Sequence, residues 1–270
     1  MCGIVGYIGD KNAIPILLEG LKRLEYRGYD SAGLAFIQNS DMIFQKTAGR
    51  IKALEELIQD KNYFTTLGIG HTRWATHGEP TNINAHPHVD CTGKIAVVHN
   101  GIIENFSELK LELENNGHNF VSKTDTEVIA HLIEENLEKN PELSLADAVT
   151  EAVKRLEGSY AIAVLSMKEP DKIVCARNES PLVLGVGENS IYCASDIPAF
   201  LQATNKAVMI NDGELVVLSS KGYEIRKIRD STVVTRQPEA SRCAPPQCNP
   251  GYPGKLRLCH KCPEPASTLP

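Results

Sequence analysis

The stretch Met1-Cys-Gly-Ile-Val-Gly-Tyr-Ile8 contains the residue around which the chain is best understood, Cys2. The apolar residues 3–8 predict a first buried strand. Once an aminopeptidase removes Met1, Cys2 carries both a thiol and a free α-amine. That amine has an ordinary pKa of about 7.7–8.0 and can accept the thiol proton, so one residue supplies nucleophile and base. An inert thiol in a buried strand is the competing interpretation, and the usual burial of cysteine favours it.

The composition is that of a globular protein that works on small molecules. The 270 residues are 42% hydrophobic and 23% charged, and no apolar run approaches the roughly 18 residues that cross a bilayer. The first residues lack the basic and apolar segments of a secretory signal, so we expect a cytoplasmic protein without a membrane segment. A net charge of -6 with both signs mixed disfavours a nucleic-acid partner, which needs a basic face.

The cysteines fall into two groups. Those that lie far apart in the chain are expected to stay reduced, and they are Cys2, Cys91, Cys175 and Cys193. The other four form Cys243-x4-Cys248-x10-Cys259-His-Lys-Cys262, which could hold zinc but has only one Cys-x-x-Cys pair. Residues 241–270 also hold seven of the fifteen prolines and no periodic apolar segment. We therefore expect one folded domain over 2–235 and an irregular, disordered tail over 236–270.

Apolar periodicity places strands at both ends of the domain and helices between them. The strands are expected at residues 3–8, 32–37, 67–71, 95–99, 160–166, 173–176, 182–186, 191–194, 207–210 and 214–218. The helices are expected at 12–24, 51–59, 106–116, 126–138, 145–156 and 197–203, with capping boxes at Thr124–Glu127 and Ser144–Asp147. This order predicts the α+β class, with sheets packed against layers of helices.

Two polar segments follow expected helices or strands and could serve a site. Arg27-Gly-Tyr-Asp-Ser-Ala-Gly33 is a turn in which Arg27 could orient a carboxylate or carbonyl near Cys2, or could be an exposed arginine at a helix end. His71-Thr-Arg-Trp-Ala-Thr-His-Gly-Glu79 contains Arg73, whose guanidinium suits an amino-acid α-carboxylate. The histidines His71, His77, His86 and His88 match no standard zinc spacing, so we expect no metal site there.

Two further segments have both a local and a functional interpretation. His99-Asn-Gly101 ends an expected strand, where Asn100 and the Gly101 N–H could form an oxyanion hole, or simply a tight Asn-Gly turn. Asp125 stands at an expected helix start, where it could bind a substrate α-ammonium or merely complement the helix dipole.

Five motifs together resemble the class II glutamine amidotransferases in order and spacing. They are Cys2-Gly-Ile-Val-Gly6, Arg27-Gly-Tyr-Asp-Ser-Ala-Gly33, His71-Thr-Arg-Trp-Ala-Thr-His77, His99-Asn-Gly101 and Thr124-Asp-Thr-Glu127. Within that class, residues 24–30, 71–80 and 84–88 look most like the glutamine-fructose-6-phosphate aminotransferases. The resemblance covers roughly residues 2–235 and implies the four-layer αββα fold of N-terminal-nucleophile hydrolases.

The resemblance also implies a role for each motif residue. Cys2 would attack the glutamine side-chain amide, releasing ammonia and then glutamate, while Asn100 and the Gly101 N–H stabilise the oxyanion. The residues expected to surround the substrate α-carboxylate are Arg73, Thr76 and His77. Asp125 would bind the α-ammonium, Trp74 would gate an ammonia channel, and Arg27 would help to order the site. No metal or organic cofactor is required.

The sequence departs from the implied family after the amidotransferase region. Residues 241–270 bear no likeness to the sugar-phosphate isomerase half that would bind fructose 6-phosphate and receive the ammonia. We therefore expect glutamine hydrolysis rather than amino-sugar synthesis from this chain alone. The alternative is a silent glutamine-binding or regulatory fragment.

Overall fold

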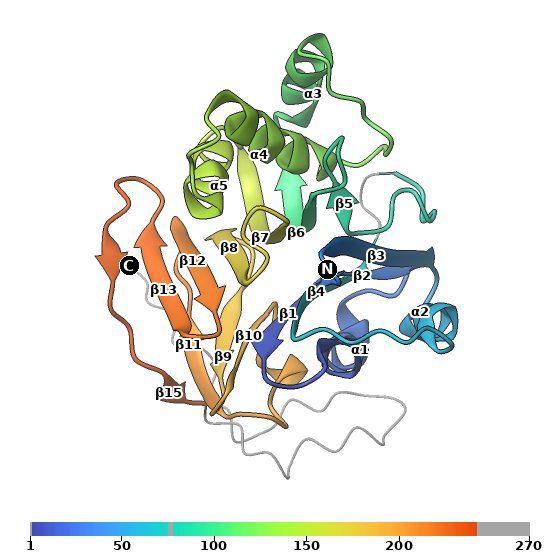
Figure 1. Ribbon diagram of the computed structural model, residues 1–270, viewed down its shortest axis with the longest axis vertical. Helices are drawn as coiled ribbons and strands as arrows, with labels where there is room; N and C mark the ends of the chain where they lie inside the picture. The colour runs from blue at the N-terminus through green and yellow to red at the C-terminus, as the bar shows by residue number, and fades with distance from the viewer. Residues whose placement is uncertain (1, 75–77, 242–270) are drawn as a thin grey trace, which may run out of the picture.

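Two antiparallel sheets lie face to face, with helices on both outer faces, in a computed structural model that describes residues 2–74 and 78–241 (Figure 1). The first sheet has the order β15-β11-β9-β10-β1-β4-β2-β3. Its strands are β1 (Gly3–Gly9), β2 (Ser31–Gln38), β3 (Asp41–Ala48), β4 (Leu67–Arg73), β9 (Val183–Val186), β10 (Ser190–Ala194), β11 (Lys206–Met209) and β15 (Glu239–Ala240). The strand that follows Cys2 is therefore in the interior of this sheet, hydrogen-bonded to β10 on one side and to β4 on the other.

The second sheet has the order β14-β13-β12-β8-β7-β6-β5. Its strands are β5 (His88–Val89), β6 (Ile95–Ile103), β7 (Gly158–Ser166), β8 (Lys172–Asn178), β12 (Glu214–Ser219), β13 (Gly222–Lys227) and β14 (Val233–Val234). Side chains of β7 alternate between its two faces: Ala161 and Ala163 face the first sheet, whereas Ile162 and Val164 face the helices. Because of this alternation, one face of β7 packs against the first sheet, and the two sheets share one apolar layer between them.

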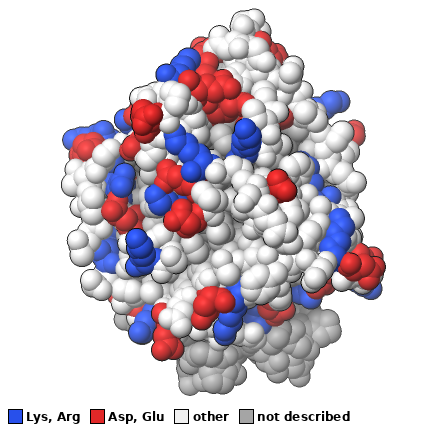
Figure 2. Space-filling model, in the orientation of Figure 1, with Lys and Arg blue, Asp and Glu red and all other residues white. Residues whose placement is uncertain are grey.

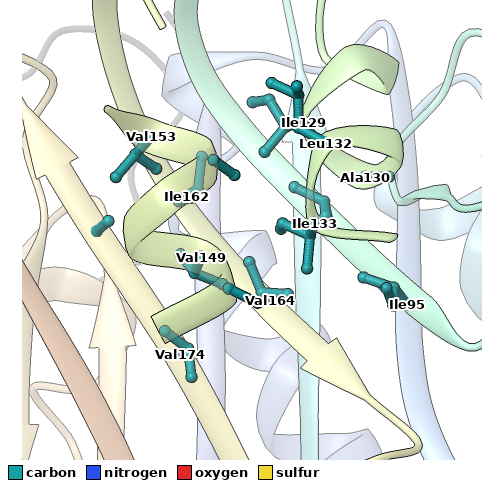
Figure 3. Close-up of a cluster of buried hydrophobic side chains, with 14 of the residues drawn as sticks. Ile95, Ile129, Ala130, Leu132, Ile133, Val149, Val153, Ile162, Val164 and Val174 are labelled. Carbon is teal, nitrogen blue, oxygen red and sulfur yellow. The ribbon is translucent and has the colours of Figure 1, made fainter. Parts of the chain in front are cut away.

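The helices cover the outer faces of the sheets. α1 (Ala13–Arg23) and α2 (Ile51–Ile58) pack on the first sheet, and α3 (Phe106–Asn115), α4 (Glu127–Lys139) and α5 (Leu145–Val153) pack on the second. Figure 3 shows Ile129 and Ile133 of α4 and Val149 of α5 over Ile162 and Val164 of β7. The predicted α+β class and αββα layering are confirmed.

Several predicted elements needed correction. Residues 197–203 form only a 3-10 turn, η2 (Ile197–Ala199), and a second such turn, η1 (Glu25–Arg27), follows α1. The hairpin strand β3 was missed because most of its residues are half-exposed and its apolar residues do not alternate strictly. Asn39 and Ser40 both have positive φ, the conformation of a two-residue hairpin turn. The short or half-exposed strands β5, β13, β14 and β15 were missed as well.

The two predicted capping boxes have different outcomes. Ser144 Oγ accepts the Asp147 N–H at 3.1 Å, as predicted for the start of α5. The box at Thr124 is wrong, because α4 begins only at Glu127. The Glu127 carboxylate instead accepts the N–H groups of Val121 and Ser122 at 2.8 and 2.6 Å. It therefore ties the preceding loop to α4.

The charges on the surface are mixed. Figure 2 shows lysine and arginine interspersed with aspartate and glutamate over the visible face. Among the described residues, no helix is both long and apolar enough to cross a membrane.

Candidate active site

Cys2 lies immediately before β1, beside the end of β4. Its Sγ accepts the backbone N–H of Trp74 at 3.2 Å and lies 3.5 Å from the Trp74 carbonyl oxygen, to which the thiol can donate. Both contacts are to main-chain atoms that continue directly from β4, so the sheet itself fixes the thiol.

Burial and nearby charges act in opposite directions on the pKa of the Cys2 thiol. Burial raises its pKa, and the Trp74 N–H and the nearby cations Arg73 and Arg27 only partly oppose this effect. This balance favours the protonated thiol, which needs a base to become a nucleophile. A free α-amine on the same residue would meet that need.

Arg27 holds the main chain at Cys2 from the 3-10 turn η1. Its Nε donates to the Cys2 carbonyl oxygen at 3.0 Å, and its guanidinium lies 3.6 Å from Asp196 Oδ2. The side chain is buried, so the interpretation as an exposed helix-end arginine is wrong. Arg27 is part of the structure around the thiol.

Asn100 reaches the same point from the opposite sheet. Its Nδ2 lies 3.2 Å from the Cys2 carbonyl oxygen and 2.7 Å from Ser195 Oγ. Its Oδ1 lies 3.0 Å from His71 Nε2, which is also 3.0 Å from the His99 carbonyl oxygen. Because both oxygens can only accept, His71 Nε2 carries the proton, and the Asn100 amide is held with its N–H groups toward Cys2.

The structure corrects the predicted turn at Asn100 and Gly101. Strand β6 continues to Ile103, and Gly101 pairs with Tyr160 of β7. Gly101 has φ of 135°, and a Cβ there would lie 2.0 Å from the Ser159 carbonyl oxygen. Glycine is thus required by a local distortion of the strand next to Asn100, not by a hairpin.

Arg73 and Asp125 are buried side chains of opposite charge. Burial lowers the pKa of Arg73, and the charges of Cys2 and Asp125 act in the opposite direction. Arg73 donates to the carbonyl oxygens of Gly78 and Glu79 at 3.3 and 3.5 Å. Asp125 is buried, and its Oδ2 accepts the Ile103 N–H at 2.9 Å.

The other predicted site residues have different outcomes. Trp74 is 46% exposed, and its ring contacts Tyr29 edge-on, with centroids 5.9 Å apart. Thr76 and His77 lie outside the described residues.

A group of buried histidines lies behind the site. Burial lowers the pKa of His71 to about 3 and also lowers the pKa values of His86, His88 and His99. The partners of His86, His88 and His99 are hydroxyls: Thr126 Oγ1 lies 2.9 Å from ring nitrogens of both His86 and His99, and Thr124 Oγ1 lies 3.1 Å from His88 Nε2. These imidazoles are neutral and link the site to the start of α4.

Ser195 is the residue of the site that sequence reasoning missed. Its Oγ accepts the Ile4 N–H at 2.8 Å as well as the Asn100 amide, so it joins β1 to β6. Ser195 directly follows the apolar strand β10 and lies 191 residues after Ile4 in the chain. Nothing in the sequence relates the two positions.

Comparisons with known proteins agree with this geometry. Residues 71–202 match the profile of the glutamine amidotransferase domain family. Proteins named glutamine-fructose-6-phosphate aminotransferase (isomerizing) from Thermococcus kodakarensis and Pyrococcus horikoshii are 53% and 52% identical over 87% and 88% of this chain. The chain spans 39% of the length of each of these relatives.

Solved structures share the architecture. Glutamine phosphoribosylpyrophosphate amidotransferase from B. subtilis is similar with a TM-score of 0.72 and 27% identity, over 84% of this chain and 49% of its own. A glutamine aminotransferase class-II domain protein from Silicibacter pomeroyi shares the fold with a TM-score of 0.56 at 16% identity, over 84% of this chain and 99% of its own.

The fold and these likenesses define the class as glutamine amidotransferases built on the N-terminal-nucleophile fold. The chain belongs to the class II glutamine amidotransferase family, and it matches the amidotransferase portion of glutamine-fructose-6-phosphate aminotransferases. The family predicted from the five motifs is confirmed. The roles of individual side chains remain predictions.

Proposed function

We propose that this chain hydrolyses glutamine to glutamate and ammonia through a thioester on Cys2. The observation that carries the proposal is the meeting of Cys2 with Asn100 at the start of β1. The Trp74 main chain holds the Cys2 thiol there, and the side-chain amide of Asn100, oriented by His71, reaches the carbonyl oxygen of the same residue from the other sheet.

The first chemical step follows from the state of the thiol. After Met1 is removed, the Cys2 α-amine takes the thiol proton directly or through a water. The sulfur attacks the side-chain amide carbon of glutamine, forming a tetrahedral intermediate whose oxyanion would be stabilised by the Asn100 amide and the Gly101 N–H. The carbon–nitrogen bond then breaks, and the amine returns the proton to the departing ammonia. Water hydrolyses the thioester and releases glutamate.

Opposite charges would select glutamine among primary amides. Arg73 is proposed to hold the α-carboxylate, with Thr76 and His77, and Asp125 to hold the α-ammonium. Burial strengthens both contacts because Arg73 and Asp125 are 4% and 6% exposed. Trp74, exposed beside the thiol, is proposed to gate the exit of ammonia.

The ammonia acceptor is proposed from the names of the relatives. Fructose 6-phosphate would be bound by a sugar isomerase domain outside the region that this chain matches, since the match covers 39% of each relative. The tail expected from residue 236 starts later, because Arg236 binds Glu214 and β15 pairs with β11 of the first sheet. We propose residues 2–241 as the amidotransferase domain and the residues after it as a separate tail. A cytoplasmic location is supported by the four cysteines of the described residues, all of them free thiols.

The test is an assay of ammonia and glutamate from glutamine, with wild type and Cys2→Ala. Intact mass first confirms that Met1 is removed, and circular dichroism confirms that the variant is folded. We expect equimolar products from wild type and none above background from Cys2→Ala. Wild type that lacks Met1 and releases no ammonia would overturn the proposal. Glutamine binding by calorimetry would then identify the silent binding fragment.

A further inference from the structure

Four potential metal ligands meet at a second place, away from Cys2. Cys91 Sγ lies 3.7 Å from His118 Nδ1 and 3.6 Å from His131 Nδ1. Glu134 Oε2 lies 2.9 Å from His118 Nδ1 and 3.0 Å from His131 Nδ1. One ligand atom from each of these four residues thus falls within 4.8 Å of all the others. We call this group the Cys91 cluster.

Three separate segments contribute to the Cys91 cluster. Cys91 is in the loop after β5, His118 follows α3, and His131 and Glu134 are one turn apart on α4. β5, α3 and α4 lie at the same end of the molecule (Figure 1). Cys91 is exposed, whereas His118, His131 and Glu134 are buried. The cluster is therefore closed on the protein side and reachable from solvent through the thiol.

The spacing of the atoms fits a tetrahedral zinc ion. With Zn–S near 2.3 Å and Zn–N near 2.0–2.1 Å, a tetrahedral site separates sulfur and nitrogen by about 3.5 Å. The two measured sulfur–nitrogen separations, 3.6 and 3.7 Å, agree with this value. The carboxylate–nitrogen separations are hydrogen-bond distances of 2.9 and 3.0 Å and need to open by only a few tenths of an ångström.

The surroundings supply the supporting contacts of a metal site. His131 presents Nδ1 to the cluster, and its Nε2 lies 3.7 Å from Glu127 Oε1, an ion-pair separation longer than a hydrogen bond. A shift of about half an ångström would place Glu127 as the carboxylate that orients a metal-bound imidazole. Cys91 Sγ accepts the backbone N–H of Asn119 at 3.4 Å, which favours a thiolate. Cys91 and Glu127 also line an open cavity of about 620 Å³, which gives an ion a path from solvent.

We propose that Cys91, His118, His131 and Glu134 bind one Zn²⁺ ion. Four protein ligands leave no open position, so the ion is structural and does not activate water. It fastens the β5–β6 loop and the segment after α3 to α4. This inference does not depend on glutamine hydrolysis.

Metal analysis of the full chain tests the site. The tail contains four cysteines that could also take zinc, so the matched control is Cys259→Ser/Cys262→Ser. After loading with zinc and desalting, we expect Cys91→Ala and His118→Ala each to lose one equivalent relative to wild type, and the tail variant to lose none. Zinc that is lost only in the tail variant, or wild type without bound zinc, would overturn the proposal.

Cobalt substitution identifies the ligands without reliance on stoichiometry. The Co²⁺-loaded wild type should show a thiolate-to-cobalt charge-transfer band that persists in the tail variant and disappears in Cys91→Ala. A band unchanged in Cys91→Ala would contradict the assignment. Should Cys91→Ala and His118→Ala fail to fold, wild type and the tail variant are each competed for zinc against a chromophoric chelator. Tight zinc binding by the tail variant then supports the site, and a tail variant that binds no zinc refutes it.

Discussion

Cys2 and Cys91 are both free thiols, and burial raises the pKa of each, but their neighbours differ. Cys2 is held by main-chain atoms of Trp74 with the cations Arg27 and Arg73 nearby. Cys91 faces two imidazoles and a carboxylate instead. Thiol pKa therefore does not distinguish the two sites. The partners do, since one set orients an amide substrate and the other can share a metal ion.

The two groups of buried histidines also differ in their hydrogen-bond partners. His86 and His99, behind Cys2, bond to the hydroxyl of Thr126 and stay neutral. His118 and His131, beside Cys91, bond to the carboxylate of Glu134. Equally buried imidazoles thus serve as neutral hydrogen-bonding groups in one region and as candidate ligands in the other.

The largest expected effect separates the two thiols. Cys2→Ala should lower glutamine-dependent ammonia release by at least about 10⁴-fold because the nucleophile is lost. Cys91→Ala, measured at a temperature where circular dichroism shows it folded, should retain the activity within about twofold, as expected for a residue without contact to substrate. A comparable loss of activity in both variants would contradict the assignment of different roles to the two thiols.

The next effect concerns the oxyanion. Asn100→Ala should lower kcat by roughly 10²–10³-fold with little change in KM, because this contact strengthens only in the transition state. Zinc content should not change, since Asn100 is not among the four residues of the Cys91 cluster. Steady-state kinetics with metal analysis on the same preparation provides both values. A change in KM alone would contradict an oxyanion role.

A smaller effect is expected at the substrate carboxylate. Arg73→Ala should raise KM by roughly 10–100-fold, the range of a charge-assisted contact, with kcat nearly unchanged because the contact is present in ground and transition states. Arg155→Ala is the matched control, because Arg155 pairs with Glu112 at 2.6 Å on the surface. Its KM should equal that of wild type. A loss confined to kcat in Arg73→Ala would argue against carboxylate binding.

The neutral histidines behind Cys2 predict a dependence of stability on pH. Burial lowers the pKa values of His71, His86 and His99 in the folded state, so below about pH 6.5 the unfolded chain takes up protons that the folded chain does not. Stability should therefore fall as pH drops from 7 to 5, by up to about 1.4 kcal/mol per pH unit for each histidine. Urea unfolding at several pH values measures this slope. A flat profile over this range would contradict neutral burial.

The sequence predicted the first region better than the second. The order of the periodic segments predicted the α+β class, and the motifs predicted the family. Cys2 and Asn100, which the motifs singled out, do lie together in the structure, while their roles stay predictions. They could not reveal Ser195, whose contact with Asn100 exists only after two sheets pack. Asn-Gly also predicted a turn, whereas Gly101 is a distorted position inside β6. Local spacing cannot distinguish these two uses of glycine.

The Cys91 cluster lay outside what spacing could predict. Its residues are separated by 27, 13 and 3 positions, and only His131 and Glu134 share an element. Zinc patterns in sequence rest on close pairs of ligands, and here the pairs form only when the loop after β5 meets α4. The tail cysteines, for which the sequence offered a zinc pattern, lie outside the described residues, so zinc binding there stays a prediction.

The most direct test of the central claim is to trap the acyl group on Cys2 with hydroxylamine. When wild type without Met1 turns over glutamine in rising concentrations of hydroxylamine, γ-glutamyl hydroxamate should replace glutamate while ammonia release continues. Both products should be absent with Cys2→Ala. Ammonia released without any hydroxamate, or hydroxamate formed equally by Cys2→Ala, would contradict a thioester on Cys2.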